Sequence, residues 1–154
     1  PQELVLAMDG ISDPGNLGTL LRIADWFGIA HMWCSMDCVE VYNPKCVQAS
    51  MGSIFRVHVN YMDIATTLTG AAHSGVRTYK AEASGADVFR TDLVRPAVLV
   101  LGSESHGLSA GMKAVAATSV AVPRFGKAES LNVAAAAAAL CMEFARQGGA
   151  EGET

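Results

Sequence analysis

Residues 97–108 read Ala97-Val98-Leu99-Val100-Leu101-Gly102-Ser103-Glu104-Ser105-His106-Gly107-Leu108, an unbroken apolar run followed by a polar, glycine-rich loop. An apolar run of this length bounded by turn residues is typical of a strand buried on both faces, as in a parallel sheet. Ligands of such sheets bind where the strands end, so we predict that the loop borders a binding site. Gly102 would let a ligand approach the backbone closely, and Gly107 would permit a tight turn.

Outward from this strand, apolar runs alternate with segments of helical periodicity. We expect strands at residues 4–8, 29–34, 54–59, 76–81, 97–101 and 120–122, and helices at residues 17–27, 44–51, 64–72, 108–117 and 132–146. This alternation predicts an α/β fold of three layers around a mainly parallel sheet. Residues 1–147 are expected to form one domain, and residues 148–154, rich in Gly and Glu, a flexible tail.

Of the 154 residues, 51% are hydrophobic and 17% are charged, a composition that supports a substantial core. No apolar run reaches the length of a membrane span, and no secretory signal is recognisable. The four cysteines match no zinc-binding spacing, so we expect reduced thiols in a cytoplasmic protein without a metal site. The formal net charge of −4 argues against a domain that binds nucleic acid through its overall positive charge. Such affinity would need another domain or a local cluster of basic residues.

A second loop follows the first expected strand and reads Asp13-Pro14-Gly15-Asn16-Leu17-Gly18. Pro and Gly turn the chain, and we expect Asn16 to cap the helix that follows. Arg22 lies off the apolar stripe of that helix, so it is not a core residue. The loop lacks the G-x-G-x-x-G fingerprint, which argues against a nicotinamide-dependent oxidoreductase.

A third loop, within residues 122–133, carries Arg124 and Lys127 and leads into an alanine-rich helix. Either Ser130 or Asn132 would cap this helix well, but capping does not explain the two basic residues. Taken singly, each of the three loops also fits a surface turn or an ordinary capped helix. His106 has no second His or Cys beside it, so it is not interpreted as a base or a metal ligand.

Together the three loops resemble the motifs of the SpoU/TrmH family of RNA 2′-O-ribose methyltransferases, within the SPOUT superfamily. The family pattern N-x-G-x-x-x-R-x-A-x-x-F-G matches residues 16–28, G-x-E-x-x-G-L matches residues 102–108, and S-L-N-V after a proline matches residues 130–133. Residues 48–53 also look like the family, and the resemblance spans residues 4–146. One departure is Arg124, which stands where relatives often carry an apolar residue and could add a phosphate contact or simply be exposed.

The resemblance implies a C-terminal trefoil knot (the SPOUT or α/β knot), a feature almost absent from proteins generally. It also implies a homodimer whose site lies near the subunit interface. S-adenosylmethionine would bind in the knot at Gly102, Val122 and Leu131, largely through backbone groups, with Leu101 and Ala81 beside them. Many relatives carry an N-terminal RNA-binding domain, so we interpret this chain as an excised catalytic domain. A single-domain relative that recognises tRNA through its dimer surface is the alternative organisation.

The implied reaction is methyl transfer from S-adenosylmethionine to a ribose 2′-hydroxyl of tRNA or rRNA. A non-catalytic RNA-binding module of the same fold is the alternative. The family's chemistry assigns catalysis to Arg22, assisted by Asn16, Glu104, Ser130 and Asn132. Arg22 could be a general base or an electrostatic stabiliser of the alkoxide, and we favour the second because Arg stays protonated. Asn16 and Ser130 are expected to orient the ribose, and Glu104 to hold Arg22 in place.

Overall fold

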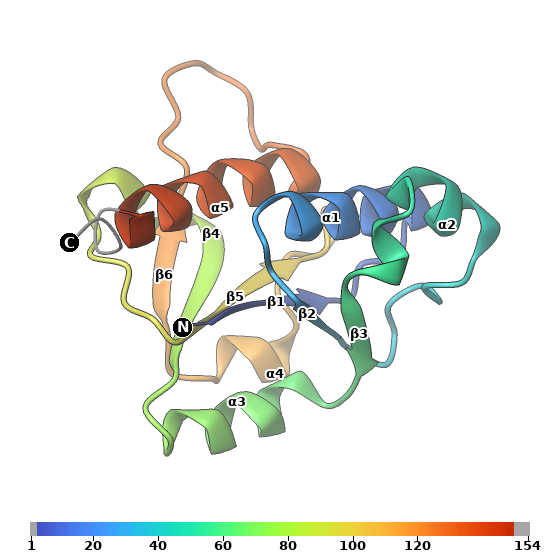
Figure 1. The fold of residues 1–154 in the computed structure, drawn as a ribbon. Coiled ribbons are helices and arrows are strands. Elements are labelled where there is room, and N and C mark those ends of the chain that lie inside the picture. Colours follow the sequence, from blue (N-terminus) through green and yellow to red (C-terminus); the bar gives the residue numbers. More distant parts are fainter. Residues whose placement is uncertain (1–2, 150–154) are drawn as a thin grey trace.

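The computed structural model describes residues 3–149, in which helices lie on both sides of a twisted sheet (Figure 1). In chain order the elements are β1 (Leu4–Asp9), α1 (Pro14–Trp26), β2 (His31–Cys34), α2 (Pro44–Ser50), η1 (Ser53–Phe55), β3 (His58–Tyr61), α3 (Ile64–Ala72), β4 (Arg77–Asp87), η2 (Val88–Arg90), β5 (Ala97–Gly102), α4 (Ala110–Lys113), β6 (Thr118–Ala121) and α5 (Val133–Gly149).

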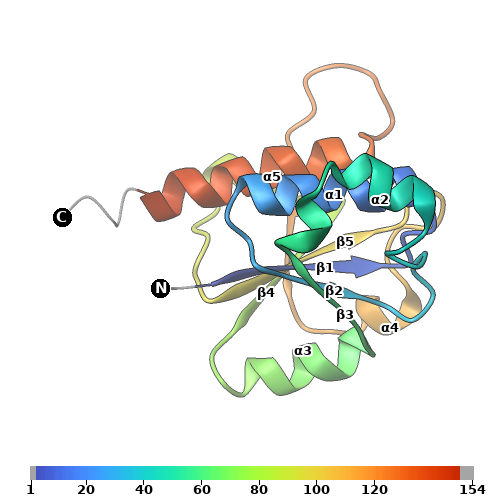
Figure 2. The same ribbon diagram turned by 45° about the vertical axis from the view of Figure 1, so that its right-hand side comes forward.

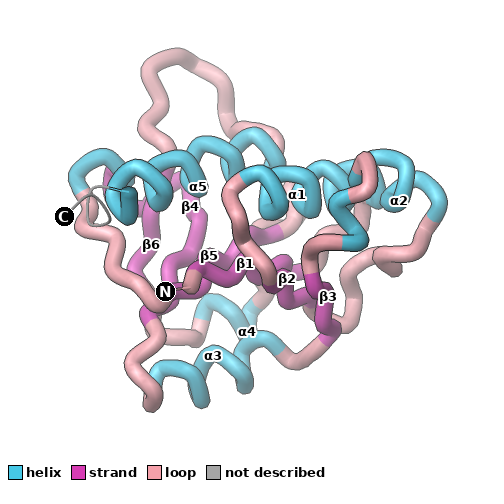
Figure 3. Tube along the Cα trace, viewed as in Figure 1, coloured by secondary structure: helices cyan, strands magenta, loops and turns pink. Residues whose placement is uncertain are grey.

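Within residues 3–149 the sheet has six strands in the order β3-β2-β1-β5-β4-β6, and each of these pairings is parallel. Helices α1, α2 and α5 cover one face, and α3 and α4 cover the other (Figure 2 and Figure 3). The predicted three-layer α/β fold around a parallel sheet is therefore confirmed. Because the strands are parallel, their carboxyl ends lie along a single edge of the sheet.

The two central strands, β1 and β5, divide the core into two clusters, because side chains of a strand alternate between its faces. Leu6 and Leu99 are fully buried in the cluster beneath α1 and α5, whereas Ala7 and Val98 belong to the cluster beside α3 and α4. Burial of each leucine side chain contributes about 1.5–3 kcal/mol. Of the five residues of the apolar stripe predicted on this helix, Leu17, Leu20, Leu21 and Ala24 are buried as expected. The fifth, Phe27, is half-buried and lies just after α1 as its C-cap.

The prediction of a strand at residues 54–59 is wrong for its first half. The chain forms the short helix η1 there, and β3 begins only at His58. The chain turns at Met51 and Gly52, which both have left-handed backbone conformations, with φ of 50° and 87°. Ser53 Oγ then donates to Asp25 Oδ2 at 2.8 Å and holds the turn against α1. The alternation of apolar residues could not reveal this turn, because the residue that holds it lies 28 positions earlier.

Two helices differ in length from their predictions. The helix predicted at residues 108–117 is limited to α4. The side chain of Ser109 accepts from the Met112 N–H, which sets the start of the helix. The final helix, α5, continues through Gly149, so the first residues of the predicted tail are helical. Residues 150–154 of that tail lie outside the described residues.

The strand predicted at residues 76–81 continues to Asp87 and carries a bulge. Ala81 and Ala86 both pair with Val120 of β6, so the residues between them leave the regular ladder. The bulge occurs next to the carboxyl end of β5, at the edge of the sheet where the polar loops lie.

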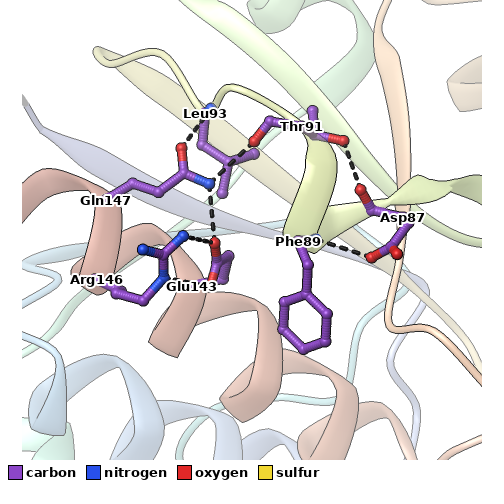
Figure 4. A network of polar contacts seen from close by, with 7 residues as sticks. All are labelled: Asp87, Phe89, Thr91, Leu93, Glu143, Arg146 and Gln147. Atoms are coloured by element: carbon purple, nitrogen blue, oxygen red, sulfur yellow. Dashed lines mark hydrogen bonds and ion pairs between the residues drawn. The ribbon is translucent and has the colours of Figure 1, made fainter.

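The C-terminal end of α5 is fastened to the segment between β4 and β5 (Figure 4). The Gln147 side chain accepts from the Leu93 N–H at 2.9 Å and donates to the Thr91 carbonyl at 3.0 Å. The buried Glu143 accepts from Gln147 at 3.0 Å and from the Arg146 guanidinium at 2.6 Å. The Arg146 guanidinium, aided by the Gln147 amide, lowers the pKa of Glu143 to about 2.

Replacing Glu143 with Gln should therefore destabilise the fold at neutral pH. A carboxyl whose pKa is depressed in the folded state contributes stability above its unfolded pKa of about 4.3 and loses it as the pH falls toward the folded value. We expect E143Q to lower the free energy of unfolding at neutral pH by about 1–2 kcal/mol and to flatten its dependence on pH below about 4.3. Urea denaturation across this pH range measures both effects.

The control for E143Q is Arg90→Gln, which removes an exposed ion pair with Asp87 at 3.9 Å in the same region. Exposed pairs of this kind contribute little, so the stability of R90Q should match that of the unsubstituted protein. If E143Q and the unsubstituted protein lose stability in parallel below about pH 4.3, Glu143 titrates near its ordinary pKa and the interpretation is wrong.

Candidate functional site

The three polar loops meet at the carboxyl edge of the sheet, as the motifs predicted. Asn132 Nδ2 donates to Glu104 Oε1 at 2.8 Å and to Asn16 Oδ1 at 3.1 Å. Asn16 Nδ2 also approaches Glu104 Oε1, at 3.4 Å. Asn16 comes from α1, Glu104 follows β5, and Asn132 precedes α5, so residues as far apart as 116 positions share one hydrogen-bonded cluster.

The role expected of Asn16 at the start of α1 is wrong, because Asp13 is the N-cap. Asp13 Oδ1 accepts from the Asn16 N–H at 3.0 Å, and Pro14 occupies the first helical position, where its missing N–H costs nothing. Asn16 therefore lies inside the first turn, and its side chain is available for Glu104 and Asn132.

Asn132 does cap α5, as predicted. Its Oδ1 accepts from the N–H groups of Ala134 at 2.9 Å and Ala135 at 3.1 Å, which leaves Nδ2 to donate to the cluster. Ser130, the other candidate cap, is exposed and forms no hydrogen bond within residues 3–149. The structure therefore distinguishes a residue that builds the site from one whose hydroxyl remains available.

Glu104 is held by the helix that Asn132 caps and not by Arg22. Its Oε1 also accepts from the Val133 N–H at 3.0 Å, at the N-terminus of α5, where the helix dipole favours negative charge. Arg22 is exposed and forms no ion pair or hydrogen bond within residues 3–149, so the expected contact between Glu104 and Arg22 is not formed within one chain. On a helix, six residues correspond to about 9 Å along the axis and to side chains roughly 120° apart. Arg22 therefore does not point in the same direction as Asn16.

Two glycines, Gly102 and Gly107, shape the loop after β5. A Cβ on Gly102 would lie 2.6 Å from the carbonyl carbon of Gly107, so the chain that approaches Gly102 closely is its own loop. Gly107 has a φ of 64°, which confirms the predicted tight turn. The turn is closed by hydrogen bonds between the backbones of Ser103 and Gly107.

Asp9 is a site-building residue that the motifs did not identify. It is the last residue of β1 and is buried, and its Oδ2 accepts from the Ser109 N–H at 2.7 Å. Asp9 thereby anchors the far end of the loop that carries Glu104. A carboxylate at the last position of an otherwise apolar strand was the sequence signal that could have identified it.

The residues predicted to bind a cofactor lie on three neighbouring strands and one loop. Leu101 and Gly102 end β5, Ala81 precedes the β4 bulge, and Val122 follows β6. Leu101 is buried, and the other three of these are half-buried. Leu131, in the loop before α5, exposes 53% of its surface.

No helix within residues 3–149 has both the length and the apolar character needed to cross a membrane. The four cysteines are buried with free thiols: Cys34, Cys38, Cys46 and Cys141. In the same part of the chain, no group of three or more His, Cys, Asp or Glu side chains is placed to hold a metal ion.

Comparison with known proteins agrees with this architecture. Residues 3–142 match the SpoU rRNA Methylase family. A TrmH-family protein from Porphyromonas gingivalis superimposes with a TM-score of 0.89 at 41% identity, over 95% of this chain and 60% of that one. The SpoU methyltransferase AviRb from Streptomyces viridochromogenes, solved with AdoMet, has a TM-score of 0.88 at 29% identity, over 97% of this chain and 62% of that one.

A curated relative from Streptomyces viridochromogenes, named 23S rRNA (uridine(2479)-2′-O)-methyltransferase, is 32% identical over 151 residues, or 94% of this chain and 53% of its own. The chain spans about half the length of the curated relatives it matches, with shares of 53%, 53% and 55% for three of them. The resemblance carried by the three motifs is therefore confirmed for the family, over a part of the relatives' length.

Proposed function

This chain belongs to the SpoU rRNA methylase family, and we propose on that basis that it transfers a methyl group from S-adenosylmethionine to a ribose 2′-hydroxyl of rRNA or tRNA. The contact among Asn16, Glu104 and Asn132, one residue from each motif, is the observation that carries the proposal. Relatives named as 23S rRNA 2′-O-methyltransferases and the AdoMet complex of AviRb support it. They favour rRNA as the substrate class.

S-adenosylmethionine fits the residues at the ends of β4, β5 and β6. An adenine ring needs apolar walls and a few backbone partners. Half-buried Val122 and exposed Leu131 supply apolar surface, while the β4 residues after Ala81, which leave the ladder with β6, and the end of β5 at Leu101 and Gly102 supply backbone groups close by. When bound, the cofactor supplies an activated methyl group on a sulfonium.

The chain's own residues divide into two groups in the proposed reaction. Asn16, Glu104 and Asn132 bond mainly to one another, so they act as positioning residues that hold three loops together. Arg22 and Ser130 are exposed without partners within residues 3–149 and are therefore available to the substrate. Ser130 orients the ribose, and protonated Arg22 holds a phosphate and stabilises the developing alkoxide while the hydroxyl proton passes to water.

The site is completed by a second copy of the chain in a homodimer. Within one chain, Arg22 lies about 9 Å along α1 from Asn16 and points roughly 120° away from it. A partner copy that packs against the exposed face of α1 would bring its own Arg22 to the cluster. The Glu104 carboxylate is already held by Asn132 and Val133. Its role in this arrangement is to position the loops of the site, and it is not needed to hold Arg22 in place.

Three broader features belong to the same proposal. The chain after β6 threads an earlier loop as a trefoil knot. Two hydrogen bonds support this, one donated by Gln147 to the Thr91 carbonyl and one accepted by Gln147 from the Leu93 N–H, because they hold α5 against the β4–β5 connection. Residues 1–147 are the catalytic domain, and part of the RNA affinity comes from another domain, because the net charge of −4 gives little bulk attraction. The protein works in the cytoplasm, where rRNA and tRNA are modified, and needs no metal.

The test uses the full-length protein with rRNA and S-adenosylmethionine labelled in the methyl group. Methylation of a 2′-hydroxyl blocks alkaline cleavage of the adjacent linkage, so the label should appear in alkali-resistant dinucleotides. Label released in mononucleotides would place the methyl group on a base and overturn the proposal. RNA binding without any transfer would favour the non-catalytic module. Calorimetry should detect S-adenosylmethionine binding and no NAD binding.

A further inference from the structure

The loop between β6 and α5 carries an exposed aromatic side chain between two basic residues. Phe125 exposes 91% of its surface, the largest fraction among the exposed large hydrophobic residues of the described chain. Arg124 and Lys127 flank it, and both are exposed. The loop stands out beyond the layer formed by α1, α2 and α5 (Figure 1 and Figure 2). An aromatic ring in this position is not explained by packing within the chain.

The loop that carries Phe125 ends at the candidate site. Seven residues after Phe125, Asn132 donates to Glu104 and Asn16. Arg124 Nη1 donates to the Ala128 carbonyl at 3.2 Å, which closes a turn around Phe125. The ring is thus exposed on a turn that is bonded within the loop.

The residues around Phe125 suit RNA better than they suit S-adenosylmethionine. Single-stranded bases stack on aromatic side chains, and Arg and Lys contact the phosphates between them. S-adenosylmethionine carries a sulfonium cation, which the charges of Arg124 and Lys127 would repel. A chain with a net charge of −4 also needs local cations wherever RNA is to approach it.

Phe55 provides a contrast within the same chain. It is 88% exposed, but the guanidinium of its neighbour Arg56 is paired with Asp25 at 2.7 Å. The charge beside Phe55 is therefore neutralised, whereas Lys127 has no partner within residues 3–149. Exposure alone does not distinguish the two phenylalanines, but the charge beside the ring and the end of its loop at Asn132 in the candidate site do.

We propose that Phe125 stacks on an unpaired nucleobase of the RNA substrate, with Arg124 and Lys127 on the adjacent phosphates. This inference rests on the proposed function and adds a substrate-positioning residue to it. It also implies that the RNA segment that meets the loop is single-stranded when it binds, because a base within a helix cannot present its face to a side chain.

The test compares F125A, F125Y and F125L with F55A in the full-length protein. Stacking of one base predicts an increase in KM for RNA of about ten-fold in F125A, with the affinity for S-adenosylmethionine unchanged. F125Y should restore KM because it keeps the aromatic face, and F125L should not, although it keeps apolar area. F55A should behave like the unsubstituted protein. The affinity for single-stranded polyuridine, measured by fluorescence anisotropy, should fall in F125A by a similar factor.

Three results would overturn the inference. Weaker binding of S-adenosylmethionine in F125A with an unchanged KM for RNA would assign the loop to the cofactor. A changed sedimentation coefficient with unchanged RNA affinity would assign it to an interface between copies. Equal RNA affinities for F125A and F55A would leave Phe125 without this role. The polyuridine measurement does not depend on turnover, so it separates failure of this inference from failure of the proposed methyl transfer.

Discussion

Replacing Arg22 with Ala is expected to abolish methyl transfer, with a loss in kcat of about 10²–10³-fold, while S-adenosylmethionine binds as before. Arg22 is exposed on α1 and makes no hydrogen bond or ion pair within residues 3–149, so its removal should not disturb the fold. Single-turnover methylation and calorimetry with the cofactor measure the two effects separately. Full activity in R22A would rule out both roles considered for Arg22, base and electrostatic stabiliser.

The same variant tests whether Arg22 acts across the dimer. Inactive R22A and inactive E104A copies, unfolded together and refolded as an equal mixture, should recover about one quarter of the unsubstituted activity. The reason is that half of the dimers are mixed, and each mixed dimer has one site with both residues intact. If Arg22 acts within its own chain, no site in the mixture is intact and no activity returns.

Replacing Glu104 with Ala is expected to lower kcat by about 10²-fold, the effect of misplacing reacting groups by about 1 Å. Glu104 Oε1 accepts from Asn16, Asn132 and the Val133 N–H, so the substitution releases three segments of chain at once. E104Q keeps an oxygen acceptor in place and should recover a substantial part of the activity. Stopped-time methylation assays give the rates, and urea denaturation shows whether E104A remains folded.

The matched control for E104A is Glu129→Ala, an exposed carboxylate in the neighbouring loop that forms no ion pair or hydrogen bond within residues 3–149. E129A removes the same charge without disturbing the contacts between loops, so its rate should be unchanged. A rate for E104A equal to that for E129A would contradict the positioning role of Glu104.

Local patterns predicted most of the fold because their causes are local. The apolar run that became β5 and the stripe Leu17, Leu20, Leu21 and Ala24 on α1 depend on periodicity alone, and both lie where expected. The strand at residues 54–59 failed because a hydrogen bond between Ser53 and Asp25 bends the chain there. Such a contact between distant residues leaves no periodic trace in the sequence.

Side-chain roles were harder to predict than their locations. Asn16 was predicted to cap α1, but Asp13 is the cap and Pro14 occupies the first helical position. Glu104 was expected to hold Arg22, but the N-terminus of α5 provides a closer partner for its carboxylate. The role of Asp9 was not predicted, because its hydrogen-bond partner, the Ser109 N–H, lies 100 positions away in the sequence.

The order of apolar runs and polar loops was enough, on its own, to predict a parallel α/β sheet, because this depends on residue type and spacing. Three motifs in the loops carried the resemblance to the family, which the comparison confirmed. Which atoms of those segments bond to one another was decided only by the folded chain. Asn16, Glu104 and Asn132 become neighbours because parallel strands bring their carboxyl ends to one edge, and hydrogen bonds then select partners by distance and direction. That selection left Arg22 outside the cluster of its own chain.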